Sequence, residues 1–484
     1  MKKILRSFLL LTMLPFGAAA QEMVTIEEYL KRVESDNPDI IAVNLSIQAA
    51  WQKVCEIDMT YSTIVSGSYN RIDDRSGPGF GSTLALDNMQ ADAFSVDASR
   101  KFSSGTSLKL GYAYSKADMS LLSPMTYDGA KYSSFTGYQL SPTLSLSQSL
   151  LREFNAGLTK SGIDKAKSGV LAGQYMLLYK KQQLMLAARA AYWNLSMARE
   201  VIDFRQSSLE RAEKLLKWNE DKIKLDLAEQ SDLYQVQAAY KLRQLNMQLA
   251  REDESRACRE FNQLLGLKSD TVNETIEKIS DKVNAFSGVT ELARAGKRAD
   301  VLAAEASYKS SEHAARETKY RAMPELSLNG SYSLNGIGFA YTEAWEQLTS
   351  QAKPTFTVGL SFIVPLDYKT LSKVRKGYDN EFASSKQNFA SALTAAQNDW
   401  DELQKNWADV KSRLELVKEI MNIQSDRLKN EQMKYEKGRT TTFLYLNAQN
   451  DLDEAVLNLY RTVLEEIMTL ARAELYNTQP INNK

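Results

Sequence analysis

The chain has 484 residues, which is enough for two or three ordinary domains with sizeable cores. Its 60 basic residues balance 60 acidic ones, so no basic surplus indicates nucleic acid as a partner. With one histidine, His313, and no paired-cysteine or phosphate-loop pattern, the sequence offers no catalytic or metal site, and we expect no enzyme and no cofactor.

The first residues have the pattern of a secretory signal. Basic residues between Lys2 and Arg6 precede the apolar stretch 8–16, and three alanines stand before Gln21. That stretch is too short to span a bilayer as a helix, which disfavours a membrane anchor. We expect residues 1–20 to be removed, and no later run approaches the roughly 18 apolar residues of a transmembrane helix. An exported chain of this kind is either soluble in the periplasm or inserted as a β-barrel.

The rest of the chain repeats one pattern. Residues 64–70 (IVSGSYN) resemble 327–333 (SLNGSYS), and residues 231–238 (SDLYQVQA) resemble 443–450 (FLYLNAQN). The offset between the copies falls from about 263 to about 212 residues, so the first copy holds roughly 50 extra residues between its two strands. Two copies of a helix, a strand pair and a long helical hairpin predict an elongated repeat architecture.

The first copy begins with a helical pattern over 25–59 and a strand over about 63–71. Residues 94–114 indicate an additional hairpin, because two alternating runs flank the turn-forming cluster 103–106 (SSGT). The closing strand over 139–149 alternates leucine with serine and threonine. The first copy is therefore predicted to contain an additional hairpin beyond the strand pair of the repeated pattern.

The second copy alternates more cleanly. Over 326–334 and 355–362, apolar residues share one face and small polar residues share the other. A period of two over about nine residues is typical of a membrane barrel strand, although a half-buried strand of a soluble sheet has the same period. Four strands cannot close a barrel alone, so strands from several subunits would have to combine, which also removes their edges.

The helical patterns are unusually long. Residues 156–224 and 367–435 contain no proline and carry a heptad seam, and each would be roughly 100 Å long. Returning helices are expected over 230–265 and 442–476 after short breaks. Long antiparallel hairpins without a globular core predict a coiled-coil tube or stalk.

The two cysteines, Cys55 and Cys258, fall inside helical patterns. We expect two buried small apolar residues here, and a disulfide between them stays open as the alternative.

With these features in this order, the chain resembles the TolC-like outer membrane efflux protein family over about 24–476. The resemblance is based on the two-copy layout, on the strand ends 148–151 (QSLL) and 364–366 (VPL), and on 435–438 (YEKG) before the second turn. The Pro-Leu pair that typically ends the family's closing strands is present in the second strand end, whereas the first has Ser149.

The resemblance implies a mainly α fold with β, in which long antiparallel coiled-coil α-helical hairpins accompany about four membrane β-strands per protomer. A homotrimer would form a twelve-stranded β-barrel in outer-membrane lipid, continuous with a periplasmic α-barrel. The hairpin at 94–114 departs from this plan, and we expect it outside the minimal barrel, as an elaboration of the first extracellular connection.

The two internal repeats set the expected domain boundaries. These are a signal peptide at 1–20, a first repeat at 21–265 (strands at about 63–149, helical hairpin at 153–265), a connecting segment at 266–289, a second repeat at 290–476 (strands at about 325–365, helical hairpin at 367–476) and a C-terminal tail at 477–484.

The breaks between long and returning helices are expected at the periplasmic tips. Gly438 suits a helix end that needs a left-handed residue, with Asp226 as the substitute, and Ser231 and Thr442 stand where N-caps belong. Ordinary helix-hairpin turns would account for these residues, and the resemblance implies that they also dock a periplasmic adaptor. The expected docking residues are Leu225, Asp226, Leu227, Ala228, Ser231, Asp232, Lys437, Gly438, Arg439, Thr440 and Thr442.

The resemblance also implies a pore constriction on the second returning helix. The best-known member has two aspartates there, and the matching positions are Leu444 and Asn447, so we do not expect an acidic, cation-binding ring. A hydrophobic ring of Leu444 would gate by dewetting. Tyr435 matches a family tyrosine near the tip, and Asp232 matches an acidic residue that ties neighbouring helices. Simple packing or a solvated surface is the alternative for both.

The expected function is an outer-membrane exit duct that passively conducts substrates received from a periplasmic adaptor (membrane fusion protein) and an inner-membrane pump. The alternative is a periplasmic coiled-coil adaptor or tether without a pore. An adaptor would normally have one long hairpin flanked by small β domains, whereas this chain interleaves two hairpins with two strand pairs. The substrate is not encoded here, because the pump selects it.

Overall fold

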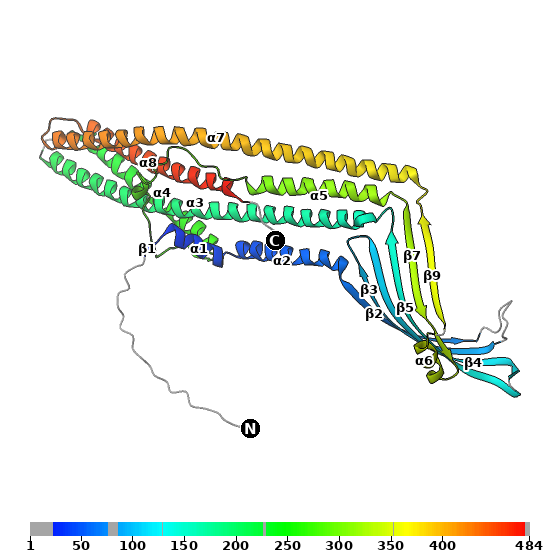
Figure 1. Cartoon of the computed structure of the whole chain (residues 1–484). Helices are drawn as coiled ribbons and strands as arrows, with labels where there is room; N and C mark the ends of the chain where they lie inside the picture. Colours follow the sequence, from blue (N-terminus) through cyan, green and yellow to red (C-terminus); the bar gives the residue numbers. More distant parts are fainter. Residues whose placement is uncertain (1–22, 76–85, 128, 226–228, 352, 480–484) are drawn as a thin grey trace, which may run out of the picture. The chain divides into compact units, whose positions relative to one another are not determined.

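The computed structural model describes residues 23–75, 86–127, 129–225, 229–351 and 353–479 (Figure 1). The expected signal peptide therefore lies outside the described residues. The chain divides into a helical unit (Met1–Leu45, Leu177–Ala299 and Ala395–Lys484) and a strand unit (Ser46–Met176 and Asp300–Thr394).

The elements follow in chain order. They are β1 (Met23–Val24), α1 (Ile26–Asp36), α2 (Pro38–Asp58), β2 (Thr63–Asp74), β3 (Leu86–Lys101), β4 (Thr106–Tyr127), β5 (Ala130–Ser149), α3 (Gly157–Lys224), α4 (Gln230–Leu264), β6 (Thr275–Ile276), α5 (Ala299–Arg321), β7 (Glu325–Leu334), β8 (Gly336–Gly338), α6 (Tyr341–Thr349), β9 (Pro354–Ile363), α7 (Tyr368–Glu436) and α8 (Thr442–Ala473), with short 3-10 turns at Met59–Tyr61, Phe154–Ala156, Ile279–Lys282 and Glu474–Asn477.

The long helices agree with the sequence prediction. Helix α3 has 68 residues and α7 has 69, and both lack the proline that would break the i→i−4 hydrogen bonds. The returning helices α4 and α8 also form where expected. Among the described residues, none of the helices combines the length and the apolar character needed to cross a membrane.

The strand unit contains one large antiparallel sheet with the order β2-β3-β4-β5-β7-β9. Figure 1 shows these strands lying side by side. The short strand β8 pairs with β5 and continues the register of β7 on that strand. Strands β2, β5, β7 and β9 join the helices at one end of the sheet, which we call the helix end; the opposite end is the far end.

The extra hairpin is part of the large sheet. Strands β3 and β4 lie inside the sheet, because β3 pairs with the whole of β2 and β4 pairs with β5. Within the described ranges the sheet therefore has six long strands, whereas the resemblance implies about four membrane strands per protomer with the hairpin outside the minimal barrel. The physical reason is that the hairpin's alternation matches that of its neighbours, so pairing places Phe94, Val96, Ala98 and Leu110 on the same face as Val65 and Leu144.

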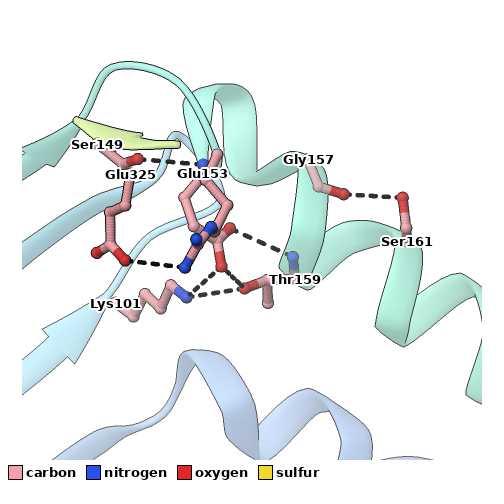
Figure 2. Close-up of polar contacts among 8 residues, drawn as sticks. Lys101, Ser149, Glu153, Gly157, Thr159, Ser161 and Glu325 are labelled. Carbon is pink, nitrogen blue, oxygen red and sulfur yellow. Dashed lines mark hydrogen bonds and ion pairs between the residues drawn. The ribbon is translucent and has the colours of Figure 1, made fainter. Parts of the chain in front are cut away.

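A polar junction fixes the helix end of the sheet (Figure 2). Lys101, the last residue of β3, lies 3.1 Å from the Glu153 carboxylate and donates to the Thr159 hydroxyl at 2.7 Å. The Thr159 hydroxyl in turn donates to Glu153 at 2.7 Å. Beside it, Arg152 forms an ion pair of 3.0 Å with Glu325 at the start of β7. The strands and the start of α3 are thus tied together by hydrogen-bonded charges.

The helices of the strand unit pack through small and aromatic residues. A Cβ at Gly157 would stand 2.6 Å from the Tyr320 ring, so the first turn of α3 approaches α5 closely only because glycine is there. Tyr308 of α5 stacks on Phe382 of α7 with ring centroids 5.4 Å apart. Close helix contacts therefore begin directly at the sheet.

The core of the helical unit surrounds Tyr29. Its ring stacks on Phe261 at 4.1 Å, and its hydroxyl donates to the Phe261 carbonyl at 3.0 Å. Burial raises the pKa of Tyr29 far above its usual value. Parallel pairing of β1 with β6 places the connecting segment in this core, where Ile279 is fully buried.

The two cysteines are free, and they differ in burial. Cys258 is buried in the helical unit, as expected, whereas Cys55 is exposed on α2, so the prediction of burial is wrong for Cys55. Most of α2 around Cys55 is exposed, which explains the error, because an apolar stripe in the sequence does not say whether a partner covers it.

Candidate channel wall and helical tip

One face of the sheet is apolar across the full width of the sheet. Residues that lie opposite one another in the register share a face, so a row can be followed from β2 to β9. The apolar row consists of Val65, Ala98, Leu110, Leu144, Tyr332 and Phe356. Its members are not covered: Val65 is 69% exposed and Phe356 is 73% exposed. Such a continuous apolar surface marks a contact with lipid or with another protein.

The opposite face is polar and carries small side chains. The adjacent polar row consists of Ser66, Asp97, Gly111, Thr143, Ser333 and Thr355. Thr143 and Ser333 share a hydrogen bond of 2.7 Å, and Asp97 forms an ion pair of 3.2 Å with Lys109. A face built of hydroxyls, glycine and an ion pair suits contact with water.

Charges bound the apolar face at both ends. On β3, Asp92 and Arg100 lie on the apolar face and are separated by about 26 Å of strand, at roughly 3.3 Å per residue. Only Phe94, Val96 and Ala98 occupy that face between them. At the 35–45° tilt of a barrel strand this length rises roughly 20 Å, which is slightly less than the apolar band of about 25 Å that outer-membrane barrels present to lipid.

An aromatic cluster lies at the far-end boundary of the apolar face. Helix α6 packs Ala344 and Leu348 on Leu140 of β5. Tyr341 lies 6.3 Å from the Tyr114 ring and 6.4 Å from Trp345, which is 46% exposed. Aromatic residues with polar edges favour the interface between lipid and water. The cluster is therefore a second feature, besides the charged residues, that is typical of a membrane boundary.

The second helical tip has the geometry expected for Gly438. Its φ of +67° is left-handed, which confirms the sequence prediction. The Arg439 amide donates to the Lys434 carbonyl at 2.8 Å, and the Gly438 amide donates to the Tyr435 carbonyl at 3.0 Å. These two bonds form a Schellman motif, which satisfies carbonyls at the end of α7. Lys437 and Thr440 complete this turn, and Thr440 donates to Glu431 at 2.8 Å.

Both predicted N-caps are wrong. Helix α8 is capped by Thr441, whose hydroxyl accepts from the Leu444 amide at 3.4 Å, and Thr442 is already the first helical residue. Helix α4 starts after Glu229, so Ser231 lies inside its first turn. The reason is that an N-cap needs extended backbone, which Thr441 and Glu229 adopt, and neighbouring hydroxyls make the position ambiguous in sequence.

The first helical tip is described only in part. Leu225, which follows α3, is 68% exposed, and Asp232 on the first turn of α4 is half-buried. The other predicted docking residues of this tip, Asp226, Leu227 and Ala228, lie outside the described residues.

Tyr435 is buried at the tip rather than exposed. Its hydroxyl contacts the Asn219 side chain of α3 at 3.0 Å and the Thr442 hydroxyl at 3.2 Å. Its ring stacks on Tyr445 at 5.1 Å and meets Trp218 edge-on at 5.0 Å. Tyr435 therefore connects α7, α3 and α8, and any influence it has on a pore acts through the position of these helices.

Leu444 and Asn447 lie on a more open side of α8. Leu444 is 45% exposed, and Asn447, three residues later on the same face, is half-buried. The predicted constriction residues thus separate into a buried tyrosine and a pair that other molecules or subunits can reach.

A buried charge cluster was missed by the sequence prediction. Arg205 of α3 and Arg243 of α4 each lie 2.9 Å from the Asp453 carboxylate of α8, and the side chains of Arg243 and Asp453 are 4% and 5% exposed. Asn450 accepts a further hydrogen bond from Arg243 at 2.8 Å. Burial raises the pKa of Asp453, and the guanidinium groups oppose that rise. The available signal was an aspartate seven residues after the buried Leu446, in an otherwise apolar stripe.

Comparison with known proteins shows the fold. The sequence matches no protein-family model and no curated protein. The structure is similar to the outer membrane protein VceC of Vibrio cholerae, with 12% identity over 93% of this chain and 95% of VceC and a TM-score of 0.63. It is also similar to the CmeC outer membrane channel of Campylobacter jejuni, with 12% identity over 95% of this chain and 87% of CmeC and a TM-score of 0.60.

A third similar structure is the MtrE outer membrane channel of Neisseria gonorrhoeae in its open state, with 13% identity over 93% of this chain and 88% of MtrE and a TM-score of 0.60. CmeC and MtrE are outer membrane channels. The chain therefore has the fold of these outer-membrane proteins, and its resemblance to TolC-like proteins is confirmed at the level of the fold.

Proposed function

We propose that this protein is an outer-membrane channel, the exit duct of a tripartite efflux or secretion system. It would conduct small molecules or exported substrates passively across the periplasm and the outer membrane. A periplasmic adaptor and an inner-membrane pump would deliver the substrate and supply the energy.

The apolar face of the sheet is the observation that supports this proposal most strongly. The row from Val65 of β2 to Phe356 of β9 is apolar throughout, while the adjacent row from Ser66 to Thr355 is polar. In water this surface would have to be covered, whereas in a bilayer lipid covers it, and the polar face then lines an aqueous lumen.

The edges of the sheet support assembly from several copies. In the described part of the chain, β2 pairs only with β3 and β9 pairs only with β7, so each has a free edge. Unpaired backbone groups cost several kcal/mol each in lipid, which requires closure. Strands β2 and β9 run in opposite directions, so β9 of one copy can pair with β2 of the next in the antiparallel sense of the whole sheet. We propose a homotrimer, as the resemblance implies.

The helical tips are the proposed docking surface for the adaptor. Leu225, Asp232 and the turn around Gly438 lie where long and returning helices meet. A helical hairpin of the partner would pack against them. The alternative function, an adaptor or tether without a pore, leaves the apolar face of the sheet unexplained.

Fractionation and conductance test the proposed function. The full-length protein should be recovered from the outer-membrane fraction, require detergent for release, and produce discrete conductance steps in a planar lipid bilayer. Release without detergent, or a purified protein that inserts no pore, would contradict a channel and favour the tether.

A further inference from the structure

The hairpin formed by β3 and β4 carries an inference that rests on the proposed function and goes beyond it. We infer that this hairpin is a transmembrane part of the barrel, so that three copies of the six long strands described here close an eighteen-stranded barrel. The partner of each free sheet edge is a second copy of this chain.

The first argument is the continuity of the rows. Ala98 and Leu110, in the hairpin, fill the apolar row between Val65 of β2 and Leu144 of β5. If the hairpin pointed into water above the membrane, selection of apolar residues at these positions would have no physical reason. A one-residue slip would exchange the two faces, so the matched register is specific.

The second argument is the depth of the hairpin. Its turn lies at the helix end of the sheet, where the Ser149 amide donates to the Gly105 carbonyl at 3.2 Å. Gly105 has a φ of +79°, and a Cβ there would stand 2.0 Å from the Glu153 carbonyl oxygen, so the turn is packed against the start of α3. The Lys101–Glu153 ion pair in Figure 2 holds the same turn against the segment before α3.

The third argument is length. Strands β3 and β4 have 16 and 22 residues, and a tilted membrane strand needs about 9–11. Both strands therefore run the full depth of the apolar band and continue beyond it. Their charged pair, Asp97 and Lys109, lies on the polar face, which is where an ion pair belongs in a water-filled barrel.

The number of strands in the barrel determines the width of its lumen. Six strands per copy is an even number, so three copies keep every neighbour antiparallel. Barrel diameter grows roughly linearly with strand number, so eighteen strands give a barrel about half again as wide as twelve, in the range where porins hold an open aqueous channel. The membrane barrel then admits larger hydrated solutes than a twelve-stranded one does.

Spin labels on single cysteines test the inference. The background carries Cys55→Ser and Cys258→Ala, and labels are placed at Val96 and Ser95 in the hairpin. Reference labels are placed at Val358 and Thr357 in β9, which lie on the same faces of the sheet as Val96 and Ser95 respectively. In liposomes, a label at Val96 should collide mainly with oxygen, as at Val358. A label at Ser95 should collide mainly with a water-soluble nickel chelate, as at Thr357.

Each outcome decides between the possibilities. If the β9 pair alternates and both hairpin labels meet the nickel chelate, the hairpin is outside the membrane and the inference is wrong, while the proposed channel stands. If the β9 pair does not alternate, the channel itself is wrong. Electron cryo-microscopy of the unmodified particle gives an independent count: eighteen strands support the inference, and twelve overturn it.

Discussion

The hydroxyl of Tyr435 lies 3.0 Å from the side-chain nitrogen of Asn219, and this contact ties the end of α7 to α3 at the helical tip. The Thr442 hydroxyl completes the group at 3.2 Å. Both Tyr435 and Asn219 are buried, so this hydrogen bond lies among buried aromatic side chains and not on the surface. The position of the tip helices thus depends on a hydrogen bond that water cannot replace.

Replacement of Tyr435 by Phe should destabilise the tip. The Asn219 amide would lose a buried partner, which costs about 1–3 kcal/mol, and the tip helices should separate more often. Chemical unfolding in detergent measures the first effect, and the open fraction in bilayer recordings measures the second. Tyr234→Phe is the matched control, because Tyr234 is exposed on α4 and should change neither quantity.

Replacement by alanine should change the free energy of unfolding in opposite directions at two glycines, one within α7 and one at its end. A Cβ would meet open space at both Gly438 and Gly377, so only the backbone distinguishes them. Gly438→Ala forces an L-residue to a φ of +67° and should destabilise by roughly 1–2 kcal/mol. Gly377→Ala lies within the helix and should stabilise by about 1 kcal/mol. Equal shifts in the unfolding midpoint would contradict the left-handed turn.

Asp453→Asn should be severely destabilising. It leaves Arg205 and Arg243 without their counter-charge in a buried site, at a cost of about 3–5 kcal/mol. The comparison is Asp451→Asn on the same helix, which removes an exposed ion pair with Arg427 and should cost at most about 1 kcal/mol. Similar unfolding free energies for the two variants would show that the buried cluster is not structural.

Glu317 should make stability depend on acid pH. Burial alone would raise its pKa, but hydrogen bonds and charges from Lys165 and Arg321 outweigh burial and hold the pKa below the ordinary 4.5. Because the folded value is the lower one, the contribution is present above pH 4.5 and is lost as the pH falls below it. Glu317→Gln should therefore lose less stability than the wild type on acidification below that value. Unfolding curves at several pH values give the slopes, and identical slopes would disprove the role.

Leu444→Ala should increase conductance if Leu444 narrows the pore. A smaller side chain weakens dewetting at a hydrophobic constriction. Phe443→Ala is the control, because Phe443 is exposed on a different side of α8. A rise in the mean open conductance for Leu444→Ala alone would support a constriction at Leu444. No change, or an equal rise for both variants, would contradict it.

Much of this fold follows from local patterns in the sequence. The absence of proline and the heptad seam predict α3 and α7 within one residue at each end, and alternation predicts β7 and β9. Gly438 was predictable because only a left-handed residue suits that helix end. These features depend on neighbours close in the chain, which is why they can be predicted without the structure.

Other features depend on contacts distant in sequence. The hairpin formed by β3 and β4 was expected, but its place between β2 and β5 depends on a register that joins separate strands. The Arg243–Asp453 pair links two helices more than 200 residues apart, and charged residues on long helices usually face solvent. The N-cap of α8 was missed by one residue, because Thr441 and Thr442 offer the same hydroxyl.

The most direct test of the central claim is the mass of the particle extracted from the outer-membrane fraction, measured by light scattering with correction for bound detergent. An outer-membrane channel that closes its sheet with other copies should give the mass of three protomers and should dissociate only when the sheet unfolds. A monomer in detergent, or a protein that leaves the membrane fraction without detergent, would contradict the channel.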